Sequence, residues 1–98
     1  MKKKSTRLRK LLKSGDLVFT IQVGTAHQAQ LAEKAGFELV GVSGSSTSVQ
    51  IFGLPDAGFV TMTELVENVE RICHAVSIPV TVDCDTGFGN AINVRRTV

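Results

Sequence analysis

The chain contains no tryptophan and no tyrosine, and only two cysteines and two prolines among its 98 residues. Cys73 and Cys84 cannot build the disulfide framework of a small secreted domain, and they lack CxxC or zinc-finger spacing. No apolar run approaches the roughly 20 residues of a membrane-spanning helix, and none resembles a signal-peptide core. The sequence therefore predicts a reduced, cytoplasmic protein with no membrane partner.

Basic charge is concentrated at the amino terminus. Seven of the eleven Lys and Arg residues precede Ser14, whereas from Ser14 onward four basic residues face nine acidic ones, a net charge of −5. A basic arm can bind nucleic acid or an anionic membrane. Leu8, Leu11 and Leu12 nevertheless follow helical spacing, which is typical of an amphipathic helix with a solvated basic face. We therefore expect an ordinary surface helix and no nucleic-acid partner.

Helix and strand patterns alternate along the chain. A first helix is predicted from about Ser5 to Ser14, ended by Gly15 in the left-handed conformation. The ensuing pattern predicts strands at 17–23, 38–42 and 80–84 and helices at 25–35, 61–76 and 90–98. The Ser- and Gly-rich stretch at 43–60 predicts a long loop.

Strands that are apolar on both faces and alternate with helices indicate a parallel sheet with right-handed crossovers. Two α/β architectures fit this order, a doubly wound sheet and a (β/α)₈ barrel. A closed barrel needs about 250 residues, and three βα units would supply about three-eighths of one. We expect a single partial domain: an amino-terminal helix at 1–15, then the first three βα units at 16–98, truncated in the helix after the third strand.

Two aspartates, Asp83 and Asp85, stand at the predicted carboxyl end of the third strand. Side chains alternate along a strand, so both would point to one face with Cβ atoms roughly 7 Å apart, and Cys84 to the other. Their charges would repel by roughly 2–3 kcal/mol at an effective dielectric near 20, which a cation or water between them would relieve. Oxygen donors without a neighbouring histidine favour Mg²⁺ or Mn²⁺. Alternatively, Asp85 caps the turn and Asp83 bonds to the backbone; spacing alone leaves both open.

A second candidate site is Ser43-Gly44-Ser45, after the second strand. Free N–H groups and short hydroxyls there suit a carboxylate or phosphate oxyanion, although such a run can also be only a turn. It is not a Walker loop, because no lysine follows at the right spacing. Asp56, in the predicted loop, is a third acidic candidate at the same end of the sheet, or else part of a type I turn.

Taken together, these segments resemble the isocitrate lyase/phosphoenolpyruvate mutase family. The resemblance runs from Asp16 almost to the end of the chain, and its most specific piece is the DxDxGFGN pattern. The matching stretches are AGF at 35–37, VSGS at 42–45, GLPD at 53–56, VDCDTGFGN at 82–90 and NVRRTV at 93–98. The pattern is most similar to 2-methylisocitrate lyase, 2,3-dimethylmalate lyase and oxaloacetate-cleaving members.

The resemblance implies a TIM barrel whose site lies at the carboxyl rim. Asp83 would bind Mg²⁺, with Mn²⁺ as a possible substitute, and Asp85 and Asp56 would hold the ion directly or through water. The run at 43–45 would hold the carboxylate of a small substrate. The metal would stabilise the enolate that develops when a C–C bond, or in the mutases a P–C bond, breaks. The full-length protein would be a homo-oligomer, by resemblance a tetramer.

One departure from the family concerns the catalytic groups. The family's acid–base residue lies in a Lys-Lys/Arg-Cys-Gly-His loop after the fourth strand, which this sequence lacks, as it lacks a glutamate beyond the third strand. We expect no catalytic residue in this fragment and no activity from it alone. Two other hypotheses stay open. One is a ketopantoate hydroxymethyltransferase-like barrel, expected to carry Asp beside the serine of the second strand. The other is a non-catalytic α/β binding module in which Asp83 and Asp85 are structural.

Overall fold

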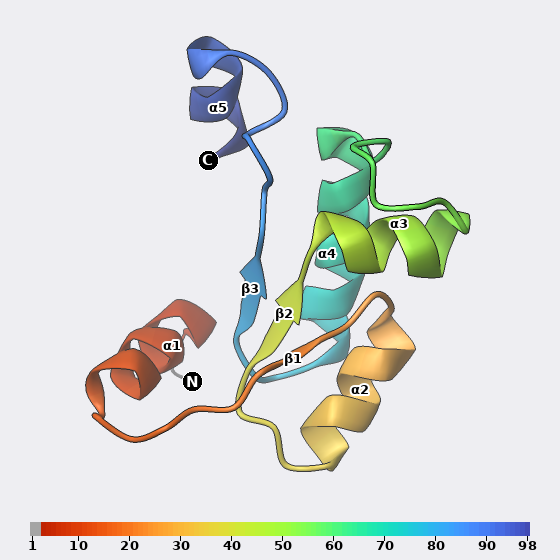
Figure 1. The fold of residues 1–98 in the computed structure, drawn as a ribbon. Coiled ribbons are helices and arrows are strands. Elements are labelled where there is room, and N and C mark those ends of the chain that lie inside the picture. Colours follow the sequence, from red (N-terminus) through yellow and green to blue (C-terminus); the bar gives the residue numbers. More distant parts are fainter. Residues whose placement is uncertain (1–2) are drawn as a thin grey trace.

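The computed structural model describes residues 3–98, so the basic residue Lys2 lies outside the described part (Figure 1). The helices are α1 (Lys4–Lys13), α2 (Ala26–Lys34), α3 (Gly44–Phe52), α4 (Met62–Ala75) and α5 (Ala91–Thr97). The strands are β1 (Ile21–Gln22), β2 (Val40–Val42) and β3 (Val80–Val82). Within residues 3–98, no helix combines the length and the apolar character needed to cross a bilayer.

The three strands form one parallel sheet in the order β1-β2-β3, which confirms the predicted parallel α/β organisation. Ile21 lies beside Val40, and Val40 lies beside Val80. The neighbouring row across the sheet consists of Gln22, Gly41 and Thr81. Parallel pairing aligns the carboxyl ends of the strands, so the segments that leave β2 and β3 emerge at the same edge.

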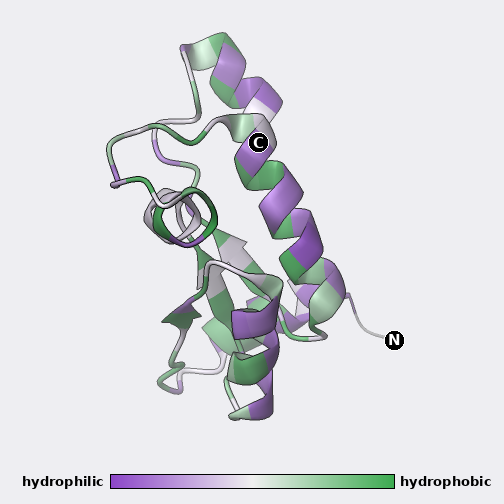
Figure 2. Ribbon diagram, turned by 90° about the vertical axis from the view of Figure 1, so that its right-hand side faces the viewer, coloured by the Kyte–Doolittle hydropathy of each residue, from purple (hydrophilic) through white to green (hydrophobic). Residues whose placement is uncertain are grey.

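The core lies between the sheet and helices α2 and α4 (Figure 1). Val40 of β2 and Ile72 of α4 are fully buried, and Leu65 is 2% exposed. Ala29 and Ala32 contribute the buried face of α2. Figure 2 shows largely hydrophobic strands, whereas the helices carry hydrophobic and hydrophilic residues side by side. This distribution is expected of amphipathic helices that cover one face of a sheet.

The other face of the sheet differs from the sequence prediction, because Gln22, Gly41 and Thr81 stand there in place of large apolar side chains. Gln22 lies across Gly41 there, so that a Cβ on Gly41 would stand 2.5 Å from Gln22 Nε2. The first strand is also shorter than predicted. Leu17 and Phe19, which precede it, are 81% and 70% exposed. Strand β1 pairs only with β2 among the described residues, so no second neighbour extends its ladder.

The predicted loop at 43–60 is wrong in its first half, which forms helix α3. Ser43 caps this helix: its Oγ accepts from the N–H of Ser46 at 3.1 Å, and Ser46 Oγ accepts from the N–H of Ser43 at 3.0 Å. Gly53 ends the helix in the left-handed conformation with φ of 64°. Serine, threonine and glycine have low helix propensity, and a serine replaces the usual Glu of the capping box, so the helix signal was masked.

Helix α1 is fastened to the carboxyl end of α4 by two basic side chains. The ammonium group of Lys4 donates to the carbonyl oxygens of Cys73 and Val76. Arg7 Nη1 donates to the carbonyl oxygen of Ser77 at 2.7 Å. Cations at a helix carboxyl end satisfy carbonyl groups that have no partner within the helix, and they complement its dipole. Part of the amino-terminal basic charge therefore has a structural role.

Candidate metal and carboxylate site

Asp83 continues the extended path of β3. Its N–H donates to the carbonyl oxygen of Val42 at 2.9 Å, and its side chain is exposed. Cys84, the next residue, lines a pocket on the α4 side together with Leu65 and Val82. Because side chains alternate along an extended chain, Asp83 lies on the face turned away from α4.

Asp85 leaves the extended path, because its φ of 49° lies in the left-handed region. The alternation expected from the sequence therefore does not reach this residue. Instead, the N–H of Asp85 donates to Asp83 Oδ1 at 2.9 Å, which is the bond of an Asx turn. Asp83 thus caps the turn, and this bond brings the two aspartates together at the carboxyl edge of the sheet. An ionised carboxylate that accepts one such bond keeps further lone pairs for a ligand.

The carboxylate of Asp85 lies against the first residue of α3. A Cβ on Gly44 would stand 2.9 Å from Asp85 Oδ2 and 3.4 Å from Oδ1. Any other residue at position 44 would force the Asp85 carboxylate to move. The amino end of a helix carries partial positive charge, which favours a neighbouring carboxylate. This contact joins the acidic candidates to the predicted carboxylate-binding run.

The run at 43–45 offers the hydroxyl of Ser45 and backbone N–H groups, but not the hydroxyl of Ser43. The hydroxyl of Ser43 is engaged in the cap with Ser46. For the N–H groups of Gly44 and Ser45, no acceptor occurs within residues 3–98. They belong to the first-turn donors that an α-helix cannot satisfy internally, and such donors bind anions. Ser45 is exposed, whereas Gly44 is buried beneath the neighbouring aspartate.

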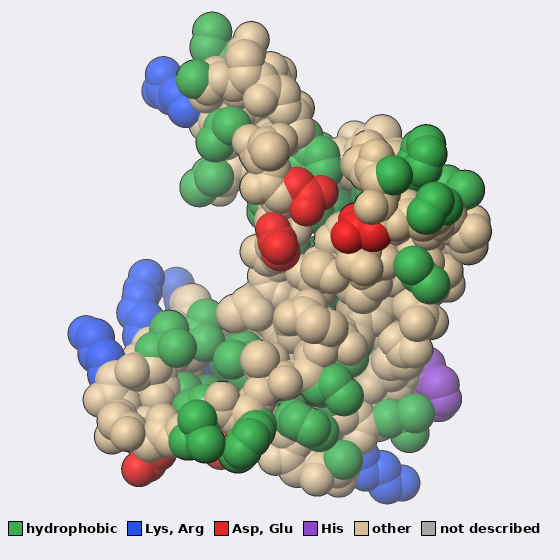
Figure 3. All heavy atoms as spheres, in the orientation of Figure 1, with side chains coloured by type: hydrophobic (Ala, Val, Ile, Leu, Met, Phe, Trp, Pro, Cys, Tyr) green, Lys and Arg blue, Asp and Glu red, His purple; other side chains and the backbone are tan. Residues whose placement is uncertain are grey.

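Asp56 and Asp85 line one pocket of about 410 Å³, with Thr86 and Phe88 also in its wall. Figure 3 shows acidic side chains around the notch between α5 and the rest of the molecule. No group of three His, Cys, Asp or Glu side chains within residues 3–98 is close enough to hold a metal ion. Mg²⁺ usually keeps several waters and needs only one or two carboxylates. The linked pair Asp83 and Asp85, with Asp56 nearby, therefore fits a hydrated Mg²⁺.

The turn that follows Asp85 contains a feature that the sequence prediction missed. Phe88 has φ of 64°, a left-handed conformation that is unfavourable for an aromatic residue, and its side chain packs against the core. Strained backbone of this kind costs about 1–3 kcal/mol and clusters at functional sites. The two glycines that flank Phe88 suggested a turn, but nothing in the sequence identified Phe88 itself as the strained residue.

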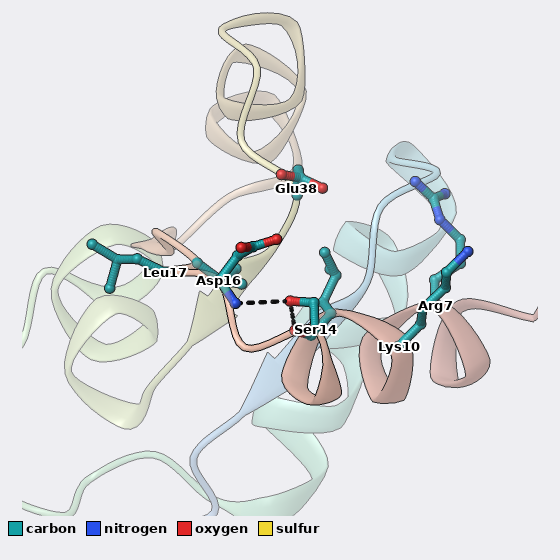
Figure 4. Close-up of a pocket in the computed structure, with 8 residues that line it drawn as sticks. Arg7, Lys10, Ser14, Asp16, Leu17 and Glu38 are labelled. Atoms are coloured by element: carbon teal, nitrogen blue, oxygen red, sulfur yellow. Dashed lines mark hydrogen bonds between the residues drawn. The ribbon is translucent and has the colours of Figure 1, made fainter.

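A second cavity of about 410 Å³ lies beside α1 (Figure 4). In Figure 4, Arg7 and Lys10 on α1 border one side of it, and Asp16 and Glu38 lie across from them. Asp16 precedes β1 and Glu38 precedes β2, so the cavity lies at the amino ends of the strands. Parallel α/β enzymes place their sites at the carboxyl ends. We therefore place the candidate site at the carboxyl rim.

Comparison with known proteins gives a consistent family assignment. The sequence profile of the phosphoenolpyruvate phosphomutase family matches residues 8–98. Isocitrate lyase of Haloferax volcanii is 46% identical over 95 residues, which are 97% of this chain and 28% of that protein. The 2,3-dimethylmalate lyase of Eubacterium barkeri is 39% identical over 94 residues, covering 96% of this chain and 32% of that protein. The chain thus spans about a third of the length of the curated relatives it matches.

Solved structures give the same assignment. Phosphonopyruvate hydrolase in complex with oxalate and Mg²⁺ has a TM-score of 0.91 and 39% identity, covering 97% of this chain and 33% of its own. A 2,3-dimethylmalate lyase, a member of the PEP mutase/isocitrate lyase superfamily, has a TM-score of 0.85 and 33% identity, and the match covers 99% of this chain and 35% of that one.

The fold is parallel α/β, with polar groups gathered at the carboxyl ends of the strands. The similar lyase and hydrolase structures share this fold. The chain belongs to the phosphoenolpyruvate phosphomutase family. The family resemblance predicted from the sequence is therefore confirmed.

Proposed function

We propose that residues 1–98 form the first three βα units of a (β/α)₈ barrel in a Mg²⁺-dependent lyase or mutase. The reaction would break a C–C or P–C bond of a small 2-hydroxy or 2-oxo carboxylate. One observation carries the proposal: Asp85 Oδ2 lies 2.9 Å from the position of a Cβ on Gly44. A carboxylate able to bind a metal ion therefore lies beside the amino end of α3, where backbone N–H groups can bind an anion. The similar phosphonopyruvate hydrolase, whose structure is a complex with oxalate and Mg²⁺, supports a proposal that includes both a small carboxylate and this ion.

The residues at this rim fall into two groups, those that hold the metal ion and those that bind the substrate carboxylate. Asp83 and Asp85 hold the metal ion, and the bond from the Asp85 N–H to Asp83 Oδ1 sets their spacing. Asp56, in the wall of the shared pocket, reaches the same ion through water, because the three carboxylates are not close enough to bind it together. The N–H groups of Gly44 and Ser45 bind the substrate carboxylate. When bound, Mg²⁺ supplies Lewis-acid stabilisation of the negative charge on the developing enolate.

Ser43 holds the first turn of α3 in place through its reciprocal cap with Ser46. Its contribution to substrate binding is therefore to orient the neighbouring N–H groups. We assign no general acid or base to the described residues and expect that group from a part of the protein outside residues 1–98. A homo-oligomer, by resemblance a tetramer, and a cytoplasmic location belong to the same proposal.

The two alternative functions find less support. A ketopantoate hydroxymethyltransferase-like barrel is expected to carry an aspartate beside Ser43, and Gly44 occupies that place. A Cβ there would collide with Asp85. A non-catalytic binding module is disfavoured by the relatives, which are named as enzymes.

The test uses the protein encoded by the longest open reading frame that contains residues 1–98. Its turnover is measured with oxaloacetate, 2-methylisocitrate, 2,3-dimethylmalate and phosphonopyruvate. We expect turnover of one of them, abolished by EDTA and restored by Mg²⁺. Asp83→Asn should abolish turnover, whereas Asp16→Asn, at the opposite end of the sheet, should leave it unchanged. Full activity in EDTA would exclude the metal role, and a reading frame that stops at Val98 would contradict the partial-barrel proposal.

A further inference from the structure

The backbone of Gly24, just beyond β1, is held by side chains from two helices. Its N–H donates to Gln28 Oε1 of α2 at 2.8 Å. Its carbonyl oxygen accepts from Asn68 Nδ2 of α4 at 2.9 Å. Asn68 is only 3% exposed, so the second bond is buried. Both backbone polar groups of Gly24 are satisfied in this way, which fixes its position relative to α2 and α4.

Helix α3 lies directly on Gly24. A Cβ on Gly24 would stand 2.6 Å from the carbonyl oxygen of Ser46 and 2.4 Å from Gln50 Cγ. Gly24 is not among the glycines with positive φ, so its backbone conformation does not require glycine. What requires glycine is the close approach of α3. Gln28 Nε2 also donates to Gln50 Oε1 at 3.2 Å, which ties α2 to α3 beside this contact.

The residue of α3 that rests on Gly24 also shapes the amino end of the helix. Ser46 exchanges two cap bonds with Ser43, so a displacement of Ser46 moves the whole first turn. That turn presents the N–H groups of Gly44 and Ser45. The rest of α3 is held by its buried residues Thr47 and Ser48, whereas residues 49 to 52 are all exposed. The contact with Gly24 acts at Ser46, the residue that closes the cap, and so it bears directly on where the first turn lies.

We propose that Gly24, held by Asn68 and Gln28, is a positioning residue that sets where the first turn of α3 presents its N–H groups to the substrate carboxylate. This inference rests on the proposed function, because it assumes a carboxylate bound at Gly44 and Ser45. Gly24 itself contacts no substrate. It acts through the close packing of a backbone against a helix, which any side chain would disturb.

Gly24→Ala in the longest open reading frame tests this role. The added methyl group displaces Ser46, so the KM of the substrate and the Kd of oxalate at saturating Mg²⁺ should both rise about tenfold. The kcat should change less than about threefold, because a contact made equally in the ground and transition states affects KM alone. A purely structural role would instead lower the apparent kcat at unchanged KM. Gln30→Ala, at an exposed position of α2, is the matched control and should match wild type.

Two further variants make the test decisive. Gly24→Ala combined with Gln50→Ala should remain impaired, because the carbonyl oxygen of Ser46 still stands 2.6 Å from the added carbon. If Gly24→Ala does not fold, Gln28→Ala removes the acceptor of the Gly24 N–H without adding atoms, and it should raise KM about threefold. Unchanged KM and oxalate Kd in the folded variants would overturn the positioning role alone. A wild-type protein that fails to bind oxalate with Mg²⁺ would overturn the proposed function, and this inference with it.

Discussion

Substitution of Gly44 by alanine separates metal binding from folding stability. Gly44 has no positive φ, so alanine introduces no backbone strain. Alanine is also favoured over glycine in a helix by up to about 1 kcal/mol, so stability should stay level or rise slightly. The new methyl group, however, would stand 2.9 Å from Asp85 Oδ2. Because ordinary van der Waals contact of a Cβ begins at about 3.4 Å, the carboxylate must withdraw by roughly 0.5 Å.

That withdrawal is large for a metal ligand, since ligand distances hold to within about 0.2 Å. We therefore expect Gly44→Ala to weaken Mg²⁺ binding about tenfold, or 1.4 kcal/mol. Calorimetric titration with Mg²⁺ of the protein encoded by the longest open reading frame measures the affinity, and thermal unfolding of the same protein measures the stability. Val49→Ala on the same helix, at a side chain that is 52% exposed, is the matched control and should leave Mg²⁺ affinity unchanged. Wild-type Mg²⁺ affinity in Gly44→Ala would refute the assignment of Asp85 as a ligand held against α3.

Two further predictions concern stability. Glu33 Oε2 accepts from Ser77 Oγ at 2.6 Å and from the N–H groups of Ser77 and Ile78 at 2.9 and 3.1 Å. These bonds, above all that from the Ser77 hydroxyl, lower the pKa of Glu33 below its ordinary 4.5, so its stabilisation is complete above that pH and is lost as pH falls through the lowered value. In the protein encoded by the longest open reading frame that contains residues 1–98, Glu33→Gln should reduce the free energy of unfolding by about 1–2 kcal/mol at pH 7 and weaken its acid dependence in urea titrations; an equal loss at pH 3 would contradict this. The 98-residue chain alone should associate and lack a sharp thermal transition, because Leu17 and Phe19 are 81% and 70% exposed beside the edge strand; a monomer with a cooperative transition would contradict this.

Short-range sequence patterns were sufficient to predict most of the helices and the parallel sheet. The predicted helix at 61–76 is α4, whose first turn is closed by a capping box: the bonds between Thr61 and Glu64 are present at 3.2 and 3.0 Å. Gly15 was predicted in the left-handed conformation after α1, and its φ is 78°. The order of apolar and amphipathic stretches predicted a parallel sheet. These features are set by residues within a few positions of one another, where local propensity and hydrophobic periodicity act directly.

Helix α3 marks the limit of such patterns. Its first turn consists of glycine and serine, so propensity predicted a loop, and the reciprocal cap of Ser43 and Ser46 overrode it. The face of the sheet that carries Gln22, Gly41 and Thr81 was also missed. These residues interrupt the largely apolar runs at 17–23, 38–42 and 80–84 only singly, and such runs are typical of strands that are buried on both faces.

The sequence by itself determined which residues stand at the carboxyl edge, because parallel strands bring Asp83, Ser43 and the segments after them to one side. Only the tertiary structure decided how those residues meet. The contact of Asp85 with Gly44 depends on the left-handed backbone of Asp85, and the place of α3 depends on its packing against Gly24. Contacts between segments distant in sequence arise from the packing of whole elements, and no periodicity within a single segment encodes them.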